Sequence, residues 1–360
     1  MKKIYFTPGP SELFFTVNDH IKNALKEQIP SISHRSGEFK KIVANTKKYI
    51  SELLNLPEGY HIAFLSSATE IWERIIQNTV EEKSLHIVNG AFSSRFYEIA
   101  SSLGKSAIKL ESNEGSCHLL TDEMIENDVE LIAFTHNETS TGAMHPMEDV
   151  YEFKSRNKDV LIALDVVSSV PCVEIDYSKV DCAYFSVQKS FGLPAGLGVW
   201  IYNERVLEKA DKLKSKGLKT GSYHTISSLH KKILEDQTPE TPNMLNIYLL
   251  GKVAEDMLQI GLPKIRRDIN YKSAVLYQAL ENHSSLKPFV SDEKFRSKTV
   301  IVAETGEKNS ADILKILNQS HLVVGSGYGK RKQSQIRIAN FAAHSNEQIE
   351  MLADRLSQLN

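Results

Sequence analysis

Residues 181–198 read DCAYFSVQKSFGLPAGLG and join an apolar run, a lysine and a glycine-rich loop. The positions up to Val187 are mostly apolar or small, which is typical of a strand buried on both faces of a sheet. Gln188 and Lys189 follow where that strand should end. A lysine that is partly withdrawn from water has a lowered pKa and can act as a neutral amine. Taken alone, Lys189 is better explained as an ordinary surface lysine at a loop start.

Similar apolar runs recur through the first 200 residues and alternate with segments of helical length. The predicted strands cover 61–67, 85–90, 131–137, 160–169, 181–188 and 197–203, and the clearest helices cover 70–82 and 93–104. Apolar strands separated by helices predict an α/β fold with a mostly parallel sheet. Ligands of such sheets bind at the carboxyl ends of the strands. The polar residues at those ends are therefore the candidate site.

The pattern changes after about residue 250. A long helix is predicted over 243–261, and the strands and helices beyond it are 298–304, 311–319, 322–329, 335–341 and a last helix from about residue 346. Ser345 and Gln348 form a capping box for that helix. We therefore expect a large domain over 1–250, whose first 15 or so residues are an N-terminal arm. A small C-terminal α+β domain is expected over 251–360.

Composition excludes several classes of protein. The 360 residues are 41% hydrophobic and carry a net charge of −2, so nothing directs the chain to nucleic acid or to a membrane surface. We see no apolar run of spanning length and no signal peptide in the first residues. Three scattered cysteines without a CxxC pair predict neither disulfides nor a metal site. A cytoplasmic enzyme is the expected class.

Two further strand ends give Lys189 a chemical context. Asp165 ends the run VLIALD, where a carboxylate can hold a pyridine nitrogen protonated. The loop SSATEIWE (66–73) opens a helix after a strand, so the amides of Ala68 and Thr69 can bind an anion. A lysine, a carboxylate and an anion cradle together suit pyridoxal phosphate. Each feature alone has an ordinary explanation as a cap or turn.

Two more loops fit the same cofactor. Phe92, in NGAFSSRF (89–96), is placed to stack on a flat heterocycle, and Thr139, in THNETSTG (135–142), offers a hydroxyl. A core phenylalanine and an ordinary turn are the alternatives. The glycines at 325, 327 and 329 do not form a dinucleotide loop, because their spacing is not GxGxxG and no helix follows. His34 and His136 lack metal-ligand spacing and are interpreted as packing residues.

The order of these motifs resembles the class V, fold type I pyridoxal-phosphate aminotransferases. FTPGP (6–10), ISHRSGEF (32–39), SATE, GAF, NETSTG, ALD and SVQKSFGLPAGLG follow in that family's order, essentially end to end. Within the class the chain is most similar to the phosphoserine aminotransferases. The most specific motif is the one that contains Lys189, and the least specific is SATE.

The resemblance implies roles for the cofactor-binding residues. Lys189 would be the Schiff-base lysine and Asp165 the partner of the pyridinium nitrogen. QTPETPN (237–243) resembles the family's NTPxT loop, which reaches the neighbouring subunit's cofactor phosphate and so implies a homodimer with a shared site. Gln237 departs from that motif, which leaves Thr238 as the candidate. The remaining cofactor contacts implied are Ala68, Thr69, Phe92, Thr139 and Gln188.

The resemblance also implies a substrate. Arg337, in QIRIAN, would bind the α-carboxylate, and Arg35, Lys330 and Arg331 would bind the distal anion. Arg331 favours a phosphorylated substrate, which implies transfer of an amino group from glutamate to 3-phosphohydroxypyruvate. Lys330 replaces the family's histidine, and GSGYGKRKQ also resembles the alanine–glyoxylate and serine–pyruvate aminotransferases. These remain the alternative, ahead of a non-catalytic cofactor-binding protein. A cysteine desulfurase is disfavoured because Gln188, not histidine, precedes the lysine.

Overall fold

The computed structural model describes residues 2–121 and 128–359 and is built around a seven-stranded sheet. Six strands run parallel to one another, and β10 runs antiparallel to both of its neighbours. The order across the sheet is β2 (Tyr60–Leu65), β10 (Gly198–Asn203), β9 (Cys182–Ser186), β8 (Leu161–Asp165), β5 (Leu131–Thr135), β3 (Lys83–Val88) and β4 (Ser106–Glu111). The predicted α/β fold with a mostly parallel sheet is confirmed.

The sequence prediction missed strand β4. Its residues SAIKLE are mainly half-buried or exposed, so β4 lacks the continuous apolar run that marks strands buried on both faces. The other edge strand, β2, is mostly buried and was predicted from such a run. The predicted run over 131–137 also divides. It forms β5 and then the short strand β6 (Asn137–Glu138), which pairs with β7 (Ala143–Met144).

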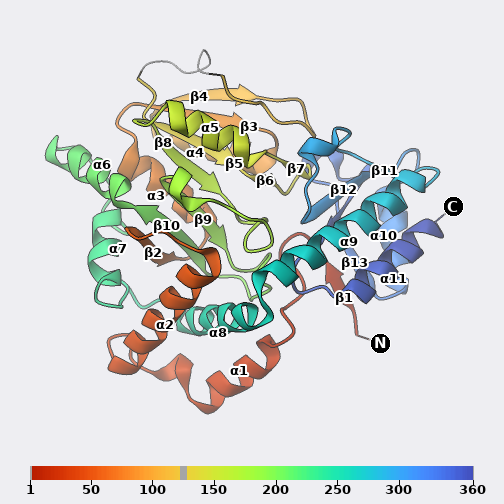
Figure 1. The fold of residues 1–360 in the computed structure, drawn as a ribbon, viewed down its shortest axis with the longest axis horizontal. Coiled ribbons are helices and arrows are strands. Elements are labelled where there is room, and N and C mark those ends of the chain that lie inside the picture. The colour runs from red at the N-terminus through yellow and green to blue at the C-terminus, as the bar shows by residue number, and fades with distance from the viewer. Residues whose placement is uncertain (1, 122–127, 360) are drawn as a thin grey trace.

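Helices cover both faces of this sheet, with α5 in front of it and α4 behind it in Figure 1. Helices α3 and α4 begin two residues before the predicted segments, because Ser67 and Gly90 are their N-caps. The helices of this part are α1 (Val17–Lys26), α2 (Gly37–Leu54), α3 (Ala68–Thr79), α4 (Ala91–Ser102), α5 (Met147–Arg156), α6 (Glu204–Ser215), α7 (Ile226–Ile233) and α8 (Met244–Ile260). Within the described ranges no helix is both long and apolar enough to span a bilayer.

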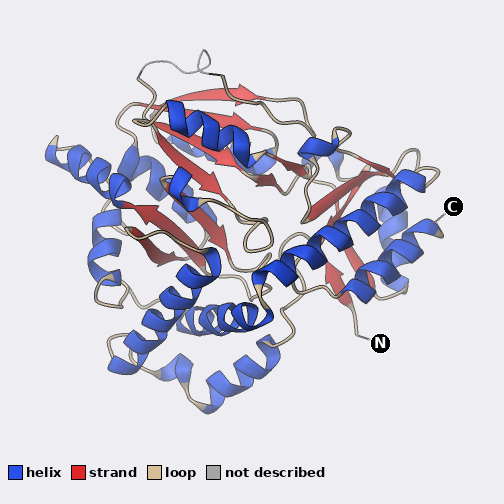
Figure 2. Ribbon diagram, in the orientation of Figure 1, coloured by secondary structure: helices blue, strands red, loops and turns tan. Residues whose placement is uncertain are grey.

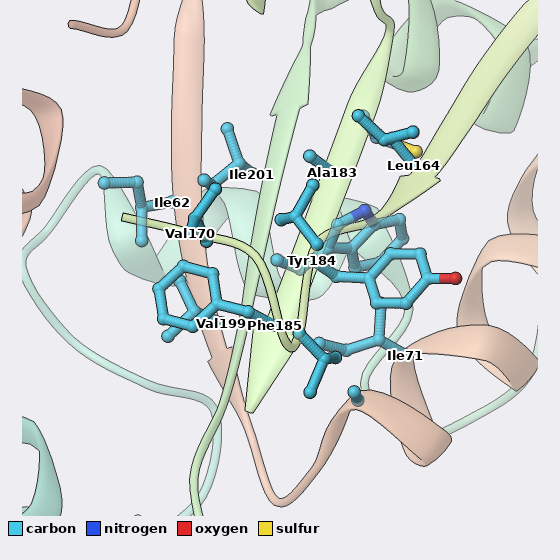
Figure 3. Packing of buried hydrophobic residues seen from close by; sticks show 14 of the residues in the cluster. Ile62, Ile71, Leu164, Val170, Ala183, Tyr184, Phe185, Val199 and Ile201 are labelled. Carbon is cyan, nitrogen blue, oxygen red and sulfur yellow. The ribbon is translucent and has the colours of Figure 1, made fainter. Parts of the chain in front are cut away.

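Strand β9 carries Lys189 at its end and is buried on both faces. Ala183 and Phe185 point to the side of Ile201 and Val199, their antiparallel partners on β10. Tyr184 points to the opposite side, toward Ile71 of α3, as Figure 3 shows. All of these side chains are almost fully buried. A strand packed in this way places the residues that follow it at a fixed point on the sheet's edge.

A second sheet and its helices form a separate hydrophobic core, which lies to the right in Figure 2. The strand order is β1 (Ile4–Phe6), β13 (Leu322–Ser326), β14 (Gln335–Ala339), β12 (Val300–Glu304) and β11 (Lys287–Pro288). The helices are α9 (Leu262–Asn282), α10 (Ser310–Gln319) and α11 (Asn346–Ser357). Ser345 and Gln348 form the predicted capping box of α11.

The N-terminal arm links the two sheets. Strand β1 pairs with β13 of the second sheet. The chain then crosses the loop around Lys189, where the Ser11 amide donates to the Gln188 carbonyl (3.1 Å) and the Phe14 amide donates to the Gly192 carbonyl (2.8 Å). Helix α8 runs through residue 250 and packs on α2. The division of the chain at that residue stays a prediction.

Candidate active site

The strand ends converge on one small cavity, as the sequence predicted. Lys189 follows β9, Asp165 ends β8, and Thr139 follows β6. Ala68 and Thr69 begin α3, and Phe92 lies in the first turn of α4. The cavity is lined by Ala68, Thr69, Trp72, Phe92, Thr135, Asn137, Thr139, Asp165, Val167, Ser186, Gln188 and Lys189. Seven candidate residues from five segments of the chain therefore share one space.

Lys189 is held in this cavity with its amine away from water. Its Nζ donates to Thr139 Oγ1 at 2.9 Å and lies 4.9 Å from the centre of the Phe92 ring. Burial lowers the pKa of Lys189 to about 8, although Asp165 and Glu138 oppose the shift. A substantial fraction of this amine is therefore neutral near pH 8, as a nucleophile requires.

Gly9 of the N-terminal arm packs against the lysine side chain. A Cβ at this position would lie 2.9 Å from Lys189 Cε, and the φ of Gly9 is +149°. Glycine is thus required both by the close approach and by the backbone conformation. The FTPGP stretch contributes to the site by confining Lys189, a role that was not predicted.

Asp165 is a buried carboxylate whose charge is only partly compensated within the chain. Its Oδ1 accepts a hydrogen bond from the Val167 amide at 2.9 Å. Burial raises the pKa of Asp165 to about 7, although the Val167 amide and Lys189 oppose the shift. In the same cavity the Gln188 Oε1 atom is buried without a hydrogen-bond partner. Both groups suit an aromatic ligand that brings a protonated ring nitrogen and polar substituents.

The loop predicted to bind an anion does open a helix, and one of its two amides has a partner within the chain; the anion-binding role stays a prediction. Ser67 caps α3 by accepting from the Glu70 amide at 3.1 Å, and the helix begins at Ala68. The Ala68 amide, which was predicted to point at a bound anion, donates to Ser186 Oγ at 2.8 Å. Ser186 ends β9 and lines the cavity, and its hydroxyl was not predicted as part of the site.

Glu138 fixes the loops that carry Phe92 and Thr139. This carboxylate is fully buried and accepts from the amides of Ser93 (3.0 Å) and Ser140 (3.0 Å) and from the Ser140 hydroxyl (2.7 Å). It therefore lies at the N-terminus of α4, where a negative charge is favourable. Glu138 is the second residue of NETSTG, but the sequence showed no local sign that it would join two loops.

Arg35 and Thr238 lie together but outside the Lys189 cavity. Arg35 Nη1 donates to the Thr238 carbonyl at 2.6 Å and to Gln237 Oε1 at 3.2 Å, and its Nη2 donates to the Pro239 carbonyl at 2.8 Å. Among the described residues that line the cavity, neither Arg35 nor Thr238 is included. The structure thus binds Arg35 to the 237–239 loop and does not bring either residue to Lys189 within one chain.

Arg337 approaches the cavity from β14 of the second sheet. Its Nη1 donates to the Thr139 carbonyl at 3.2 Å and its Nε donates to the Ser326 carbonyl at 2.8 Å. The guanidinium faces the Tyr328 ring at 5.3 Å, and that ring contacts Phe92 with centroids 5.3 Å apart. Burial lowers the pKa of Arg337 from its ordinary value. This arginine therefore stands beside the aromatic wall of the site.

Lys330 and Arg331 line a second cavity together with Tyr328, whose ring contacts Phe92. Both pair with Glu114, at 2.9 Å from Lys330 Nζ and 3.0 Å from Arg331 Nη2. Arg331 Nη1 also lies 3.5 Å from Glu304. The structure brings the two predicted cations together, and it adds two carboxylates that the sequence did not indicate.

Comparison with known proteins assigns the chain to a protein family. The model of the aminotransferase class-V family matches residues 4–352. The chain belongs to the class-V aminotransferases. A phosphoserine aminotransferase of Rhodococcus jostii is 29% identical over 326 residues, which cover 89% of this chain and 85% of the relative. Class-V aminotransferases depend on pyridoxal phosphate, so this chain uses that cofactor.

Solved structures agree with the fold of this aminotransferase. A phosphoserine aminotransferase of Cytophaga hutchinsonii is 50% identical with a TM-score of 0.97, and 99% of each chain is covered. An aspartate aminotransferase of Thermus thermophilus has 24% identity and a TM-score of 0.86, covering 99% of this chain and 98% of that chain, which supports the fold alone.

Proposed function

We propose that this aminotransferase moves the amino group of L-glutamate to 3-phosphohydroxypyruvate, giving 2-oxoglutarate and O-phospho-L-serine. The single observation that carries the proposal is the pair of cations Lys330 and Arg331 in a cavity next to Arg337 and the Lys189 site. One set of cations then serves two distal anions of similar reach, a γ-carboxylate and a phosphate. The similarity to phosphoserine aminotransferases supports the same substrates. We also propose that the enzyme works in the cytoplasm.

The residues that would hold the cofactor surround the cavity. Asp165 would pair with the ring nitrogen, Phe92 would stack on the ring, and Thr139 and Gln188 would contact its polar substituents. Thr69 and Ala68 at the start of α3 would bind the phosphate. Bound there, pyridoxal phosphate supplies an aldehyde that reacts with amines and a ring that accepts electron density from the substrate's Cα.

Side chains of the protein would transfer the proton of the substrate's Cα and orient the substrate. Lys189 Nζ, kept largely dry and with a pKa near 8, takes the proton from the substrate's Cα as a general base and returns it as a general acid. Asp165 keeps the proton on the ring nitrogen. Arg337 binds the α-carboxylate, and its contact with the Thr139 carbonyl fixes its direction. Gly9 and the arm above it restrict water near the amine.

We further propose that the working enzyme is a homodimer. Thr238 and Arg35 are joined by a hydrogen bond but lie outside the Lys189 cavity of their own chain. Because they are bonded to each other, both residues would enter the active site of a second chain together. In that arrangement Thr238 contacts the partner's cofactor phosphate and Arg35 contacts the partner's substrate.

A specific observation keeps a second candidate function open. Glu114 and Glu304 balance the charges of Lys330 and Arg331, which favours an uncharged distal end, as in glyoxylate or pyruvate. A cysteine desulfurase is disfavoured further, because burial raises the pKa of Cys117 to about 12 and leaves it a poor nucleophile.

A spectral half-reaction assay tests the proposal. L-Glutamate should change the cofactor's absorption, and 3-phosphohydroxypyruvate should restore it, whereas glyoxylate and pyruvate should restore it far more slowly. Arg331→Leu should lower kcat/KM for 3-phosphohydroxypyruvate by about tenfold or more, the order expected for one lost charge-assisted contact, and spare glyoxylate. Faster turnover of glyoxylate by the unmodified enzyme would favour the second candidate.

A further inference from the structure

The cavity that holds Lys330 and Arg331 already contains an anion of the chain's own. It has a volume of about 280 Å³ and lies between the segment after β4 and the short helix Gly329–Arg331 that follows β13. Its lining includes Glu111, Glu114, Phe289 and Tyr328 beside the two cations. Tyr328 also contacts Phe92, so this cavity adjoins the one around Lys189.

Glu114 occupies the donors that a substrate's distal anion needs. Arg331 directs both Nε (3.1 Å) and Nη2 (3.0 Å) at Glu114 Oε2, while Lys330 Nζ lies 2.9 Å from Oε1. Two donors of the guanidinium thus converge on one carboxylate oxygen, and Lys330 takes the other, so both oxygens of Glu114 are paired with cations. Hydrogen bonds from Lys330 and from Arg331 hold the pKa of Glu114 below its ordinary value, so it is charged at neutral pH.

The ion pairs of Glu114 with Lys330 and Arg331 are open to water, so another anion can replace Glu114. The Glu114 side chain is 37% exposed and that of Lys330 is 77% exposed. Ion pairs so open to water contribute little to stability. Arg331, by contrast, is also held by the Phe289 ring, 5.2 Å from its guanidinium, and by Glu304. Loss of the Glu114 contact would therefore leave Arg331 in place to receive another anion.

We propose that Glu114 is a resident counter-ion of the distal substrate subsite, which the substrate's distal anion displaces and whose charge then sets the preference between carboxylate and phosphate. This inference rests on the proposed function, since it assigns Lys330 and Arg331 to the distal anion. Once displaced, Glu114 remains tethered nearby and repels the incoming group. A phosphate, with nearly two negative charges, is repelled about twice as strongly as a carboxylate with one.

Equilibrium binding to the cofactor-loaded enzyme tests this without turnover. The probes are glutarate, which ends in a carboxylate, and 3-phosphoglycerate, which ends in a phosphate and has no keto group to react. The Kd of each is measured by calorimetry for the unmodified enzyme, Glu114→Gln and the control Glu111→Gln. Glu111 lines the same cavity but pairs with Lys109 at 2.8 Å.

Glu114→Gln should lower the Kd of glutarate by about threefold and that of 3-phosphoglycerate by about tenfold. These are the orders expected when the charge of Glu114 no longer repels one negative charge (glutarate) or two (3-phosphoglycerate) a few ångströms away in water. Glu111→Gln should leave both values within about twofold, because exposed pairs have small effects. Unchanged or weakened binding in Glu114→Gln would overturn the proposal. Equal tightening of both probes, or the same change in Glu111→Gln, would also overturn it.

The outcomes separate this inference from the proposed function. If the enzyme fails to use 3-phosphohydroxypyruvate but Glu114→Gln still favours 3-phosphoglycerate over glutarate, the counter-ion role stands and the substrate assignment falls. If the enzyme uses 3-phosphohydroxypyruvate and neither Kd changes in Glu114→Gln, the substrate assignment stands and the counter-ion role falls. If neither probe binds to any of the three proteins, there is no distal anion subsite, and both the counter-ion role and the proposed function are overturned.

Discussion

His224 links the anion cradle to the 237–241 loop, and its charge should be measurable as pH-dependent stability. Its Nδ1 lies 2.6 Å from Glu70 Oε1 and its Nε2 lies 2.7 Å from Glu240 Oε2. Glu70 in turn accepts from the Ser66 amide and hydroxyl at the cradle. Burial alone would lower the pKa of His224, but the hydrogen bonds to Glu240 and Glu70 raise it to about 9.

The size of the effect follows from this pKa. A rise from 6.5 to about 9 corresponds to at most about 3.4 kcal/mol, at about 1.36 kcal/mol per pKa unit. We halve this to about 1.7 kcal/mol because the Glu240 side chain is partly open to water. Since the folded-state pKa lies above the unfolded-state value, this contribution is complete below pH 6.5 and disappears as the pH rises through about 9.

His224→Asn isolates the charge, because His224 has a φ of 52° and asparagine tolerates that conformation. The variant should unfold about 2 °C lower than the unmodified protein at pH 6, with the gap closing by pH 10. Thermal unfolding is followed after borohydride reduction of the loaded enzyme, so that cofactor loss does not contribute. His321, with a φ of 62°, supplies the control His321→Asn. A gap independent of pH, or the same pH dependence in the control, would refute the reasoning.

Two further predictions concern the site. Gly90→Ala would place a Cβ 2.4 Å from Glu138 Cγ, so it should cost about 1–3 kcal/mol of stability and weaken cofactor binding in a titration. The control Gly37→Ala meets nothing within 4 Å, and equal effects in both would contradict the role of Glu138. Lys189→Ala and Arg35→Leu should each be inactive, yet subunit exchange between them should restore up to about a quarter of normal activity if Arg35 acts across a dimer. No recovery from verified mixed dimers would exclude the shared site.

The sequence predicted those parts of the fold that depend on local pattern. Strands buried on both faces carry continuous apolar runs. The predicted bounds of β5, β8 and β9 therefore differ from the observed bounds by four residues or fewer. Strand β4 was not predicted, because its side chains are mainly half-buried or exposed and form no continuous apolar run. The reversed direction of β10 and the pairing of β1 with β13 depend on partners far along the chain.

The same distinction applies to the candidate site. Lys189, Asp165 and Phe92 were predicted to lie together because each is at or just after the end of a strand, and the topology of a parallel sheet brings strand ends together. Glu138 and Gly9 were missed because their roles depend on contacts with residues distant in sequence. The engagement of Arg331 by Glu114 is also long-range, and no spacing rule indicates it.

The most direct measurement of the central claim is the position at which borohydride fixes the cofactor. Lys272 provides an internal comparison, because it is also buried and its pKa is also lowered to about 8 by burial. Its Nζ, however, donates to the carbonyls of Phe341 and His344. Peptide mapping of the reduced, cofactor-loaded enzyme should find the added mass on Lys189, and Lys189→Ala should carry none. The same mass on Lys272, or undiminished labelling of Lys189→Ala, would contradict the assignment of Lys189 as the reacting amine.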